Sequence, residues 1–342
     1  MGCAGYPSAS PGNLLPPTPP FFGVALEGYP LSRERLAREE EALGLSPGMV
    51  VFFLQWPDPA TVSVSGGDGA VFPLNSVASI RQRGAVPCIT WEPMYIDGMG
   101  REQAVSAHEV MSGRYDVYIR AFASQARHWG RPVLVRFAHE MNLARYHWGT
   151  DAAGFGPESP GIYREMFRYV VSLSREEGAK NLLWVFCPNA ESVPNPLHDA
   201  RASWNAARHY YPGDAWVDIL GMDGYNWGET QTAEHHGWKS DWRGFGEIFM
   251  DIHEELRDLS RSKPILVFET ASVAVGGDRE SWVRDALEVM VRWRIWGFNW
   301  FQVVKEQDWS IRKGRDDGVL HTIWRSTTPV SLSPWGQGIK EP

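Results

Sequence analysis

Short apolar runs alternate along the chain with longer segments in which apolar residues recur three and four positions apart. The alternation begins at Phe21 and repeats about eight times, which is typical of βα units around a parallel sheet. Predicted strands cover residues 22–27, 49–55, 86–91, 133–139, 182–187, 217–222, 265–269 and 297–302. Predicted helices cover residues 33–43, 115–128, 162–177, 246–259 and 279–293. Several strands are continuous apolar runs, as expected for strands buried on both faces.

Two architectures fit this alternation, a closed barrel and an open doubly wound sheet. A Gly-rich phosphate-binding fingerprint would favour the open sheet, but the first strand is followed by Glu27-Gly28-Tyr29-Pro30. We therefore predict an α/β fold, a (β/α)8 TIM barrel. No repeat, low-complexity block or linker interrupts residues 21–342, so this stretch is predicted to be a single domain. Residues 1–20 are predicted to be a flexible Pro-rich segment.

Composition excludes some classes of partner. The chain has 342 residues, of which 43% are hydrophobic and 22% charged, and this balance is typical of a folded protein with a large core. Its formal net charge is -8 and no Lys/Arg-rich block occurs, so we expect no nucleic-acid partner. The 17 Trp residues suit the flat apolar faces of sugar rings, although core packing also uses Trp.

The first residues leave two interpretations of cellular location. No apolar run reaches the roughly 20 residues that span a bilayer, and the start lacks the features of a signal peptide. Gly2-Cys3 and the Pro-rich stretch to Pro20 fit either a lipoprotein whose signal has been removed or an ordinary flexible terminus. We expect a secreted or cell-surface protein and a monomer, with no membrane span.

Neither a metal nor a cofactor is predicted. The cysteines lack metal-site spacing, and Cys88 and Cys187 lie inside apolar strands where a thiol behaves as a small hydrophobe. His235-His236 are adjacent rather than four residues apart on a helix, so they do not form a typical zinc pair. A Gly-x-Ser-x-Gly elbow is also absent, which argues against ester or peptide hydrolysis.

Carboxylates stand at the ends of several predicted strands, where the active sites of barrels are built. These strand-end residues are Glu27, Glu92, Glu140, Asp223 and Glu269. Glu140 and Glu269 each end an apolar run, and burial there would suit one protonated acid and one ionised base. Taken singly, either could instead be a structural carboxylate paired with Arg136. For Glu92 we expect a subsite or structural role, and for Glu191 an exposed loop position.

The segment Arg136-Phe137-Ala138-His139-Glu140-Met141-Asn142, followed by Tyr146 and Trp148, resembles the acid/base motif of glycoside hydrolase family 26, in which His precedes the catalytic Glu. Residues 217–226 resemble the family's sixth-strand motif and residues 263–270 its nucleophile strand. Residues 300–309 resemble its final motif. The resemblance covers residues 21–312.

The resemblance implies that Glu140 is the acid/base, that Glu269 is the nucleophile and that Tyr225 hydrogen-bonds the nucleophile. Predicted substrate-binding residues are His139, Arg136, Tyr225, Trp91, Trp300, Asn142 and Trp148, with Trp300 as a stacking floor and Trp91 as another wall. Core or rim packing is the alternative for Tyr225, Trp91 and Trp300.

The family resemblance implies a retaining β-glycanase that acts on a β-linked polysaccharide, with β-1,4-mannan as the leading substrate. Endo action is expected if the cleft is open, whereas long loops after the second, fifth and sixth strands would instead close it into an exo pocket. After the motif Asn the chain reads Leu143-Ala144-Arg145-Tyr146, which departs from the family's mannanases. Mixed-linkage β-1,3-1,4-glucan and β-1,3-xylan therefore stay open, as does a bacterial exopolysaccharide or envelope glycan. A non-catalytic polysaccharide-binding protein is the alternative of another class, but both strand-end Glu residues are present.

Overall fold

The computed structural model describes residues 19–60, 71–146, 148 and 154–328. The predicted flexible segment 1–20, including Gly2-Cys3, lies outside the described residues except for Pro19 and Pro20. Among the described residues, none of the helices combines the length and apolar character needed to cross a membrane.

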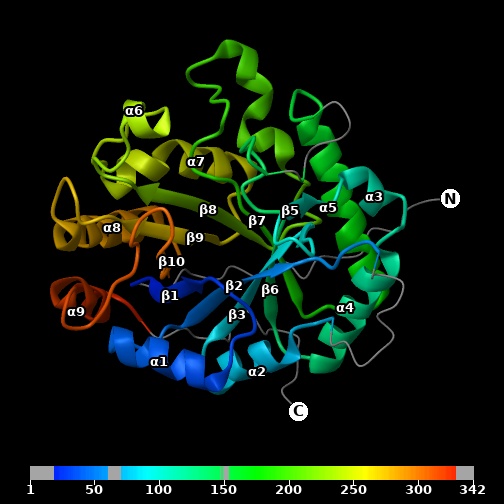
Figure 1. Ribbon diagram of the computed structural model, residues 1–342, viewed down its shortest axis with the longest axis horizontal. Helices are drawn as coiled ribbons and strands as arrows, with labels where there is room; N and C mark the ends of the chain where they lie inside the picture. Colours follow the sequence, from blue (N-terminus) through cyan, green and yellow to red (C-terminus); the bar gives the residue numbers. More distant parts are fainter. Residues whose placement is uncertain (1–18, 61–70, 147, 149–153, 329–342) are drawn as a thin grey trace.

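Eight parallel strands close into a barrel, which confirms the predicted (β/α)8 fold (Figure 1). They are β1 (Phe21–Leu26), β2 (Met49–Gln55), β3 (Val86–Glu92), β6 (Val133–Phe137), β7 (Leu182–Phe186), β8 (Ile219–Asn226), β9 (Ile265–Ser272) and β10 (Gly297–Phe301). Their order around the barrel is β1-β10-β9-β8-β7-β6-β3-β2. All the predicted strands are present, and their carboxyl ends meet at one face.

Helices surround the barrel in Figure 1. They are α1 (Arg33–Leu43), α2 (Leu74–Gln82), α3 (Ala107–Met111), α4 (Asp116–Trp129), α5 (Ser159–Glu176), α6 (Ala233–His236), α7 (Phe245–Leu259), α8 (Arg279–Trp293) and α9 (Asp317–Ser326), with 3-10 turns η1 (Ala200–Asn205) and η2 (Ala207–Tyr210). Helices α2, α3, α6 and α9 were not predicted from the sequence. The five predicted helices have ends within three residues of the predicted ones.

One apolar face of each long helix packs on the barrel. In α7 the buried residues recur three and four positions apart and are Phe245, Ile248, Phe249, Ile252 and Leu256. This spacing aligns them along one side of a helix with 3.6 residues per turn. In α1 the Ser32 side chain accepts a hydrogen bond from the Arg35 N–H, and Gly44 ends the helix in the left-handed region at φ 66°.

Two departures from the predicted elements affect the site. Strands β8 and β9 continue past residues 222 and 269, and a register shift at Met222/Asp223 pairs Asp223 with Glu269. After β3 the chain forms an antiparallel hairpin of β4 (Met94–Ile96) and β5 (Glu102–Ala104), which the sequence analysis did not predict. The hairpin rises from the carboxyl end of β3, so it becomes one border of the face where the strand ends meet.

Candidate active site

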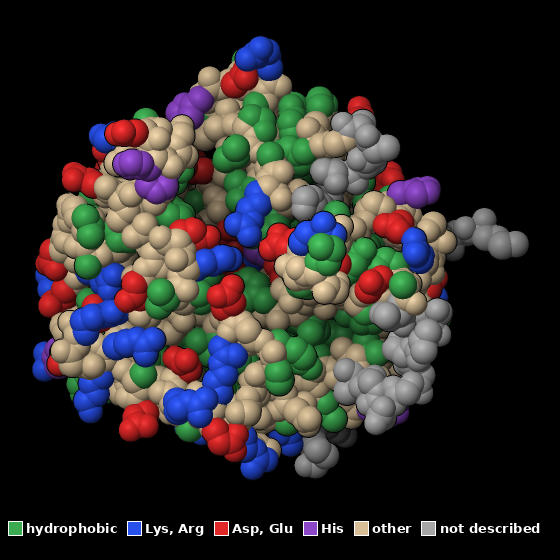
Figure 2. All heavy atoms as spheres, in the orientation of Figure 1, with side chains coloured by type: hydrophobic (Ala, Val, Ile, Leu, Met, Phe, Trp, Pro, Cys, Tyr) green, Lys and Arg blue, Asp and Glu red, His purple; other side chains and the backbone are tan. Residues whose placement is uncertain are grey.

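A cleft with a volume of about 480 Å³ opens at the carboxyl ends of the strands. Figure 2 shows this face hollowed near its centre, with acidic and basic side chains around the hollow. The cleft is lined by Glu27, Gly28, Tyr29, Phe53, Gln55, Glu92, Met94, Ile96, Glu102, His139, Glu140, Leu143, Arg145, Tyr146, Asn189, Tyr225, Trp227, Glu269, Phe301, Lys305, Glu306 and Trp309. Both carboxylates predicted to be catalytic are therefore in one cavity.

Glu140 follows β6 in a backbone conformation that side chains rarely adopt, with φ at 50°. Its backbone N–H donates to the carbonyl of Cys187 over 2.7 Å, which fixes the turn against the end of β7. Asn189 Nδ2 donates to Glu140 Oε1 over 2.8 Å. Burial, followed by the negative charge of Glu269, raises the pKa of Glu140 to about 7. A carboxyl with this pKa is protonated in a large share of molecules near neutral pH.

Glu269 lies on β9 and accepts hydrogen bonds at both carboxylate oxygens. Arg136 Nη2 donates to Oε1, and the hydroxyl of Tyr225 donates to Oε2. The Arg136 bond joins opposite charges and is the stronger type. The two donors fix the orientation of an ionised carboxylate that faces the same cavity as Glu140.

Arg136 is fully buried beneath the cleft and does not line it. It pairs with Asp223 as well as with Glu269, and its Nε and Nη2 donate to Thr90 Oγ1 over 2.9 and 2.7 Å. The predicted contact between Arg136 and the sugar is therefore wrong in this structure. Arg136 instead orients Glu269 from below, through the ion pair that the sequence analysis gave as the structural alternative for a strand-end carboxylate.

His139 lines the cleft beside Glu140. Its ring lies 6.1 Å from that of Phe53 and 4.9 Å from that of Tyr146, measured between centroids. Burial, followed by the positive charges of Arg136 and Arg145, holds the pKa of His139 well below its usual range. A neutral imidazole next to the acid can exchange hydrogen bonds with a sugar hydroxyl without adding charge.

Asn142 and Trp148 support the cleft without lining it. Asn142 Oδ1 accepts from the backbone N–H of Asn189, and its Nδ2 donates to the Asn189 carbonyl, each over 2.9 Å. Trp148 Nε1 donates to the carbonyl of His139 over 2.6 Å. Asn142 therefore positions Asn189, the partner of Glu140, which the sequence analysis did not select. The available signal was a polar residue two positions after the predicted strand 182–187.

Trp91 and Trp300 do not form the predicted sugar platforms, because both are fully buried and neither lines the cleft. The Trp91 ring stacks on Phe122 of α4 at 4.2 Å, and Trp300 faces Trp282 of α8 at 6.4 Å. Successive side chains of a strand point to opposite faces. The next residue on each strand, Glu92 or Phe301, is accordingly the one that lines the cleft.

Aromatic residues line the cleft on the β8 side instead. They are Tyr225, Trp227, Phe301 and Trp309. The rings of Trp227 and Trp309 meet edge to face at 4.8 Å, and Tyr225 lies 5.1 Å from Trp309. Trp309 belongs to the last motif recognised in the sequence, but its loop position gave no direct indication of where its ring would point.

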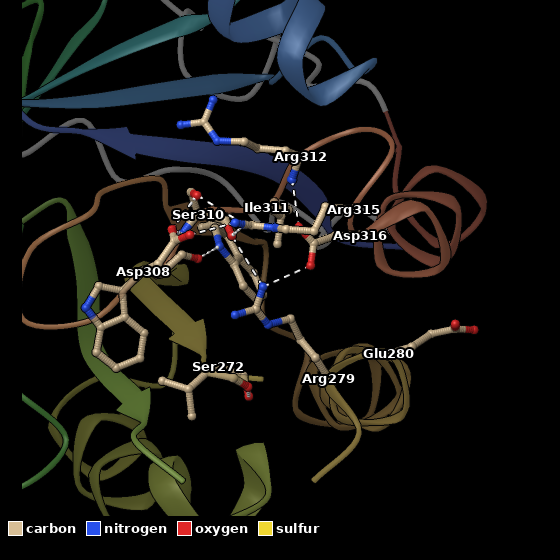
Figure 3. Close-up of polar contacts among 12 residues, drawn as sticks. Ser272, Arg279, Glu280, Asp308, Ser310, Ile311, Arg312, Arg315 and Asp316 are labelled. Carbon is tan, nitrogen blue, oxygen red and sulfur yellow. Dashed lines mark hydrogen bonds and ion pairs between the residues drawn. The ribbon is translucent and has the colours of Figure 1, made fainter. Parts of the chain in front are cut away.

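Ion pairs hold the loop that carries Trp309 (Figure 3). Arg279 of α8 donates to the carbonyl of Ser310 over 3.3 Å and to Asp316 over 3.0 Å. Arg315 donates to Asp308 over 2.6 Å. These contacts fix the residues on both sides of Trp309, so its ring is held at the cleft by a preformed loop.

The remaining strand-end and loop carboxylates differ in position. Glu92 lines the cleft and accepts a hydrogen bond from Gln55 Nε2 over 2.5 Å. Glu27 also lines it and pairs with Lys305 over 3.7 Å. Glu191 pairs with Arg243, lies outside the cleft and is exposed, as predicted. Within the described part of the chain, no group of three or more His, Cys, Asp or Glu residues could hold a metal ion.

Residues 103–241 match Glycosyl hydrolase family 26. Over this segment, which includes Glu140 and Tyr225, the chain is similar to glycoside hydrolase family 26. Endoglucanase H of Acetivibrio thermocellus is 30% identical over 271 residues, covering 74% of this chain and 27% of that protein. A mannan endo-1,4-beta-mannosidase of Bifidobacterium adolescentis is 32% identical over 126 residues, 34% of this chain and 11% of that protein. The chain thus spans about a quarter or less of the length of these relatives.

Solved structures of family 26 enzymes share the fold. Bacillus subtilis mannanase BCman superposes with a TM-score of 0.60 at 17% identity, covering 94% of this chain and 89% of that one. The β-mannanase BoMan26A of Bacteroides ovatus superposes with a TM-score of 0.57 at 17% identity, covering 91% and 89%. At this identity the likeness concerns the barrel alone.

Proposed function

We propose that this chain is a retaining endo-β-glycanase that hydrolyses β-1,4-mannan. The observation that carries the proposal is the pair of unlike carboxyl groups in one cleft. Burial and the charge of Glu269 raise the pKa of Glu140 to about 7, whereas Glu269 is held by Arg136 and Tyr225. One acid that retains its proton and one oriented carboxylate are what a double displacement at a sugar requires.

In the first step, Glu269 attacks the anomeric carbon and Glu140 transfers its proton to the departing glycosidic oxygen. The bond between the anomeric carbon and that oxygen breaks, and an ester bond to Glu269 forms. Tyr225 and Arg136 hold the Glu269 carboxylate in place for this attack. The negative charge of Glu269 disappears in the ester.

The loss of that charge prepares the second step. Because the Glu269 charge raises the pKa of Glu140, the pKa of Glu140 falls once the ester forms. Glu140 then accepts a proton from water, which attacks the anomeric carbon and releases the sugar with its original configuration. The two carboxyls supply the nucleophile and all proton transfers, so the proposed reaction includes neither a metal nor another cofactor.

Mixed-linkage β-1,3-1,4-glucan is a second candidate substrate. An endoglucanase matches 74% of this chain, whereas the mannosidase of Bifidobacterium adolescentis matches 34%. Arg145 lines the cleft at the point where the sequence departs from the family's mannanases. Its guanidinium lies over the Tyr146 ring at 5.2 Å, which places a bulky cation beside the acid.

The cellular setting is also part of the proposal. We propose that residues 21–342 are the catalytic domain, that it acts as a monomer, and that it is secreted or displayed at the cell surface. A polysaccharide is too large to reach an enzyme inside a cell, which supports an external location.

A product profile tests the proposed function. The purified protein is incubated with β-mannan, mixed-linkage β-glucan, β-1,3-xylan and cellulose oligosaccharides, and anomeric NMR follows whichever substrate is cut. Mannan cleavage with retained configuration is the expected result. Cleavage of glucan or xylan alone would move the substrate but keep the mechanism, and inverted products would remove Glu269 as the nucleophile.

A further inference from the structure

Trp238 is a large aromatic side chain on the face that carries the cleft, and 45% of its surface is exposed. It is not part of the cleft lining, but its ring meets that of Trp227 at 5.6 Å with an interplanar angle of 83°. Trp227 lines the cleft and meets Trp309 at 4.8 Å. The three rings therefore form a continuous series from inside the cleft to the surface beyond it.

The segment that carries Trp238 is tied down by hydrogen bonds. Gln231 and Ser240 exchange two of them, from Gln231 N to Ser240 Oγ over 3.0 Å and from Ser240 N to the Gln231 carbonyl over 3.2 Å. His236 Nδ1 accepts from the Thr232 N–H over 3.0 Å, closing the short helix α6. Trp238 is thus held in position without a ligand, which lowers the entropy cost of binding one.

Both ends of this segment are anchored to β8. Asn226 Oδ1 accepts from the N–H of Gly228 over 3.2 Å and from the N–H of Arg243 over 3.0 Å. Trp242 packs against Gly277, where a Cβ would lie 2.4 Å from its ring. Trp242 therefore serves as the partly buried anchor of the segment, and Trp238 presents the more exposed ring.

We propose that Trp238 is a platform for one sugar ring of a polysaccharide chain that extends out of the cleft past Trp227. This inference rests on the proposed function, because it assigns a further binding position to the same substrate. A pyranose with equatorial β-links exposes C–H groups on its flat faces, and these pack well on an indole ring. Lys239 and Asp241, one and three positions after Trp238, form an exposed ion pair over 2.7 Å and offer partners for sugar hydroxyls.

The chain offers a matched control for this platform. Trp324 on α9 is 62% exposed, and its ring lies 6.0 Å from that of His321 on the same helix. It is absent from the cleft lining and has no ring contact with a residue of the lining. Removing Trp324 therefore changes the exposed aromatic surface of the protein without touching the proposed path of the polysaccharide.

Steady-state kinetics test the platform with mannohexaose and mannotriose as substrates. Trp238→Ala is expected to raise the KM for mannohexaose about fivefold, which corresponds to about 1 kcal/mol, and to change the KM for mannotriose less than about twofold. Trp324→Ala is expected to leave both unchanged. Equal KM changes for the two substrates, or no change for either, would overturn the proposal.

A binding measurement separates this proposal from the proposed function. In Glu269→Ala protein, affinity electrophoresis in gels that contain galactomannan or mixed-linkage β-glucan measures binding without turnover. Retardation that weakens in the Trp238→Ala background supports the platform even if the wild-type protein cuts neither polymer. If the wild type hydrolyses a polymer, and the Glu269→Ala protein is retarded equally with and without Trp238→Ala, the platform alone is overturned. Absence of both hydrolysis and retardation overturns both proposals.

Discussion

The two sides of the cleft differ in chemistry although they belong to one barrel. On the β2 and β3 side the lining includes a polar pair at the strand ends, Gln55 and Glu92, which are joined by a hydrogen bond. On the β8 side it is aromatic, with Tyr225, Trp227 and Trp309 in contact with one another. We call these the polar wall and the aromatic wall, each defined by the residues just named.

The difference follows from how each wall is supported. Gln55 and Glu92 are register partners at the ends of the adjacent strands β2 and β3. The sheet therefore fixes the direction of both polar side chains, so that they can hydrogen-bond sugar hydroxyls at defined positions. Trp227 and Trp309 lie on loops beyond the strands, and loops provide room for large rings. The comparison suggests that the polar wall selects the sugar and the aromatic wall holds the chain, while Glu140 and Glu269 act between them.

The largest expected effect comes from removing the group between the walls. Glu269→Ala should lower kcat at least about 10⁴-fold, because no other carboxylate in the cleft is held by both Arg136 and Tyr225. Reducing-sugar release on mannan measures this loss, and an unchanged thermal transition shows that the fold survives. Glu191→Ala, which removes an exposed carboxylate outside the cleft, is the control and should retain wild-type turnover. Near-normal turnover of Glu269→Ala would exclude Glu269 as the nucleophile.

The next effect concerns stability rather than rate. Arg136→Met removes the cation that pairs with two buried carboxylates, Asp223 and Glu269. Breaking a buried ion pair from one side costs about 3–5 kcal/mol, because the remaining charges have no partner. Urea unfolding at neutral pH measures this loss of unfolding free energy. Replacement of the half-exposed Arg243, which pairs with Glu191 alone within the described residues, should cost less than about 1 kcal/mol. Equal losses would show that the buried cluster is not a special support of the site.

The polar wall makes a prediction about substrate recognition. Glu92→Ala should lower kcat/KM about 10- to 100-fold, because leaving the hydrogen-bond partners of a buried group unsatisfied costs roughly 1–3 kcal/mol. Glu92→Gln should retain most activity at pH 5–6. Burial raises the pKa of Glu92 to about 7, so the wild-type group is largely neutral there. Oligosaccharides that lack single hydroxyls identify the position that Glu92 reads. A uniform loss across all deoxy substrates would assign Glu92 a structural role instead.

The aromatic wall should respond differently to the same assay. Trp227→Ala is expected to lower kcat/KM about 2- to 10-fold, which corresponds to the roughly 0.5–1.5 kcal/mol of an aromatic contact. The loss should be similar for every deoxy substrate, since stacking does not depend on one hydroxyl. Trp227→Phe should recover part of it. A loss confined to one deoxy substrate would show that Trp227, like Glu92, recognises a single hydroxyl. The two walls would then not differ in how they bind the sugar.

Much of this arrangement was predictable from the sequence. The apolar runs located all eight barrel strands, and the strand-end rule brought Glu140 and Glu269 to one face. The direction of a side chain at a strand end was not predictable, because a shift of one residue turns it to the other face. That is why Trp91 and Trp300 were expected in the cleft, whereas Glu92 and Phe301 line it.

Loops and long-range pairs account for the other misses. Asn189 reaches Glu140 only because Asn142 binds both backbone groups of Asn189 across 47 positions of sequence. Neither residue carries a local pattern that indicates the contact. The double pairing of Arg136 likewise depends on the shifted register between β8 and β9, which is set by tertiary packing.

The smallest expected effect is a shift in the pH dependence of kcat. It tests whether Glu140, and not a residue of either wall, sets that dependence. Catalysis requires protonated Glu140, so kcat should fall as pH rises through its pKa of about 7. The hydrogen bond from Asn189 lowers the pKa of Glu140, because it favours the ionised carboxylate. Asn189→Ala removes that bond, so the alkaline limb of the kcat profile should move to higher pH, with a modest change in kcat at pH 5. Glu92→Gln should leave the limb in place, since the proton of Glu92 is not transferred. If the alkaline limb moved in Glu92→Gln and stayed in place in Asn189→Ala, the limb would reflect the titration of Glu92 rather than that of Glu140.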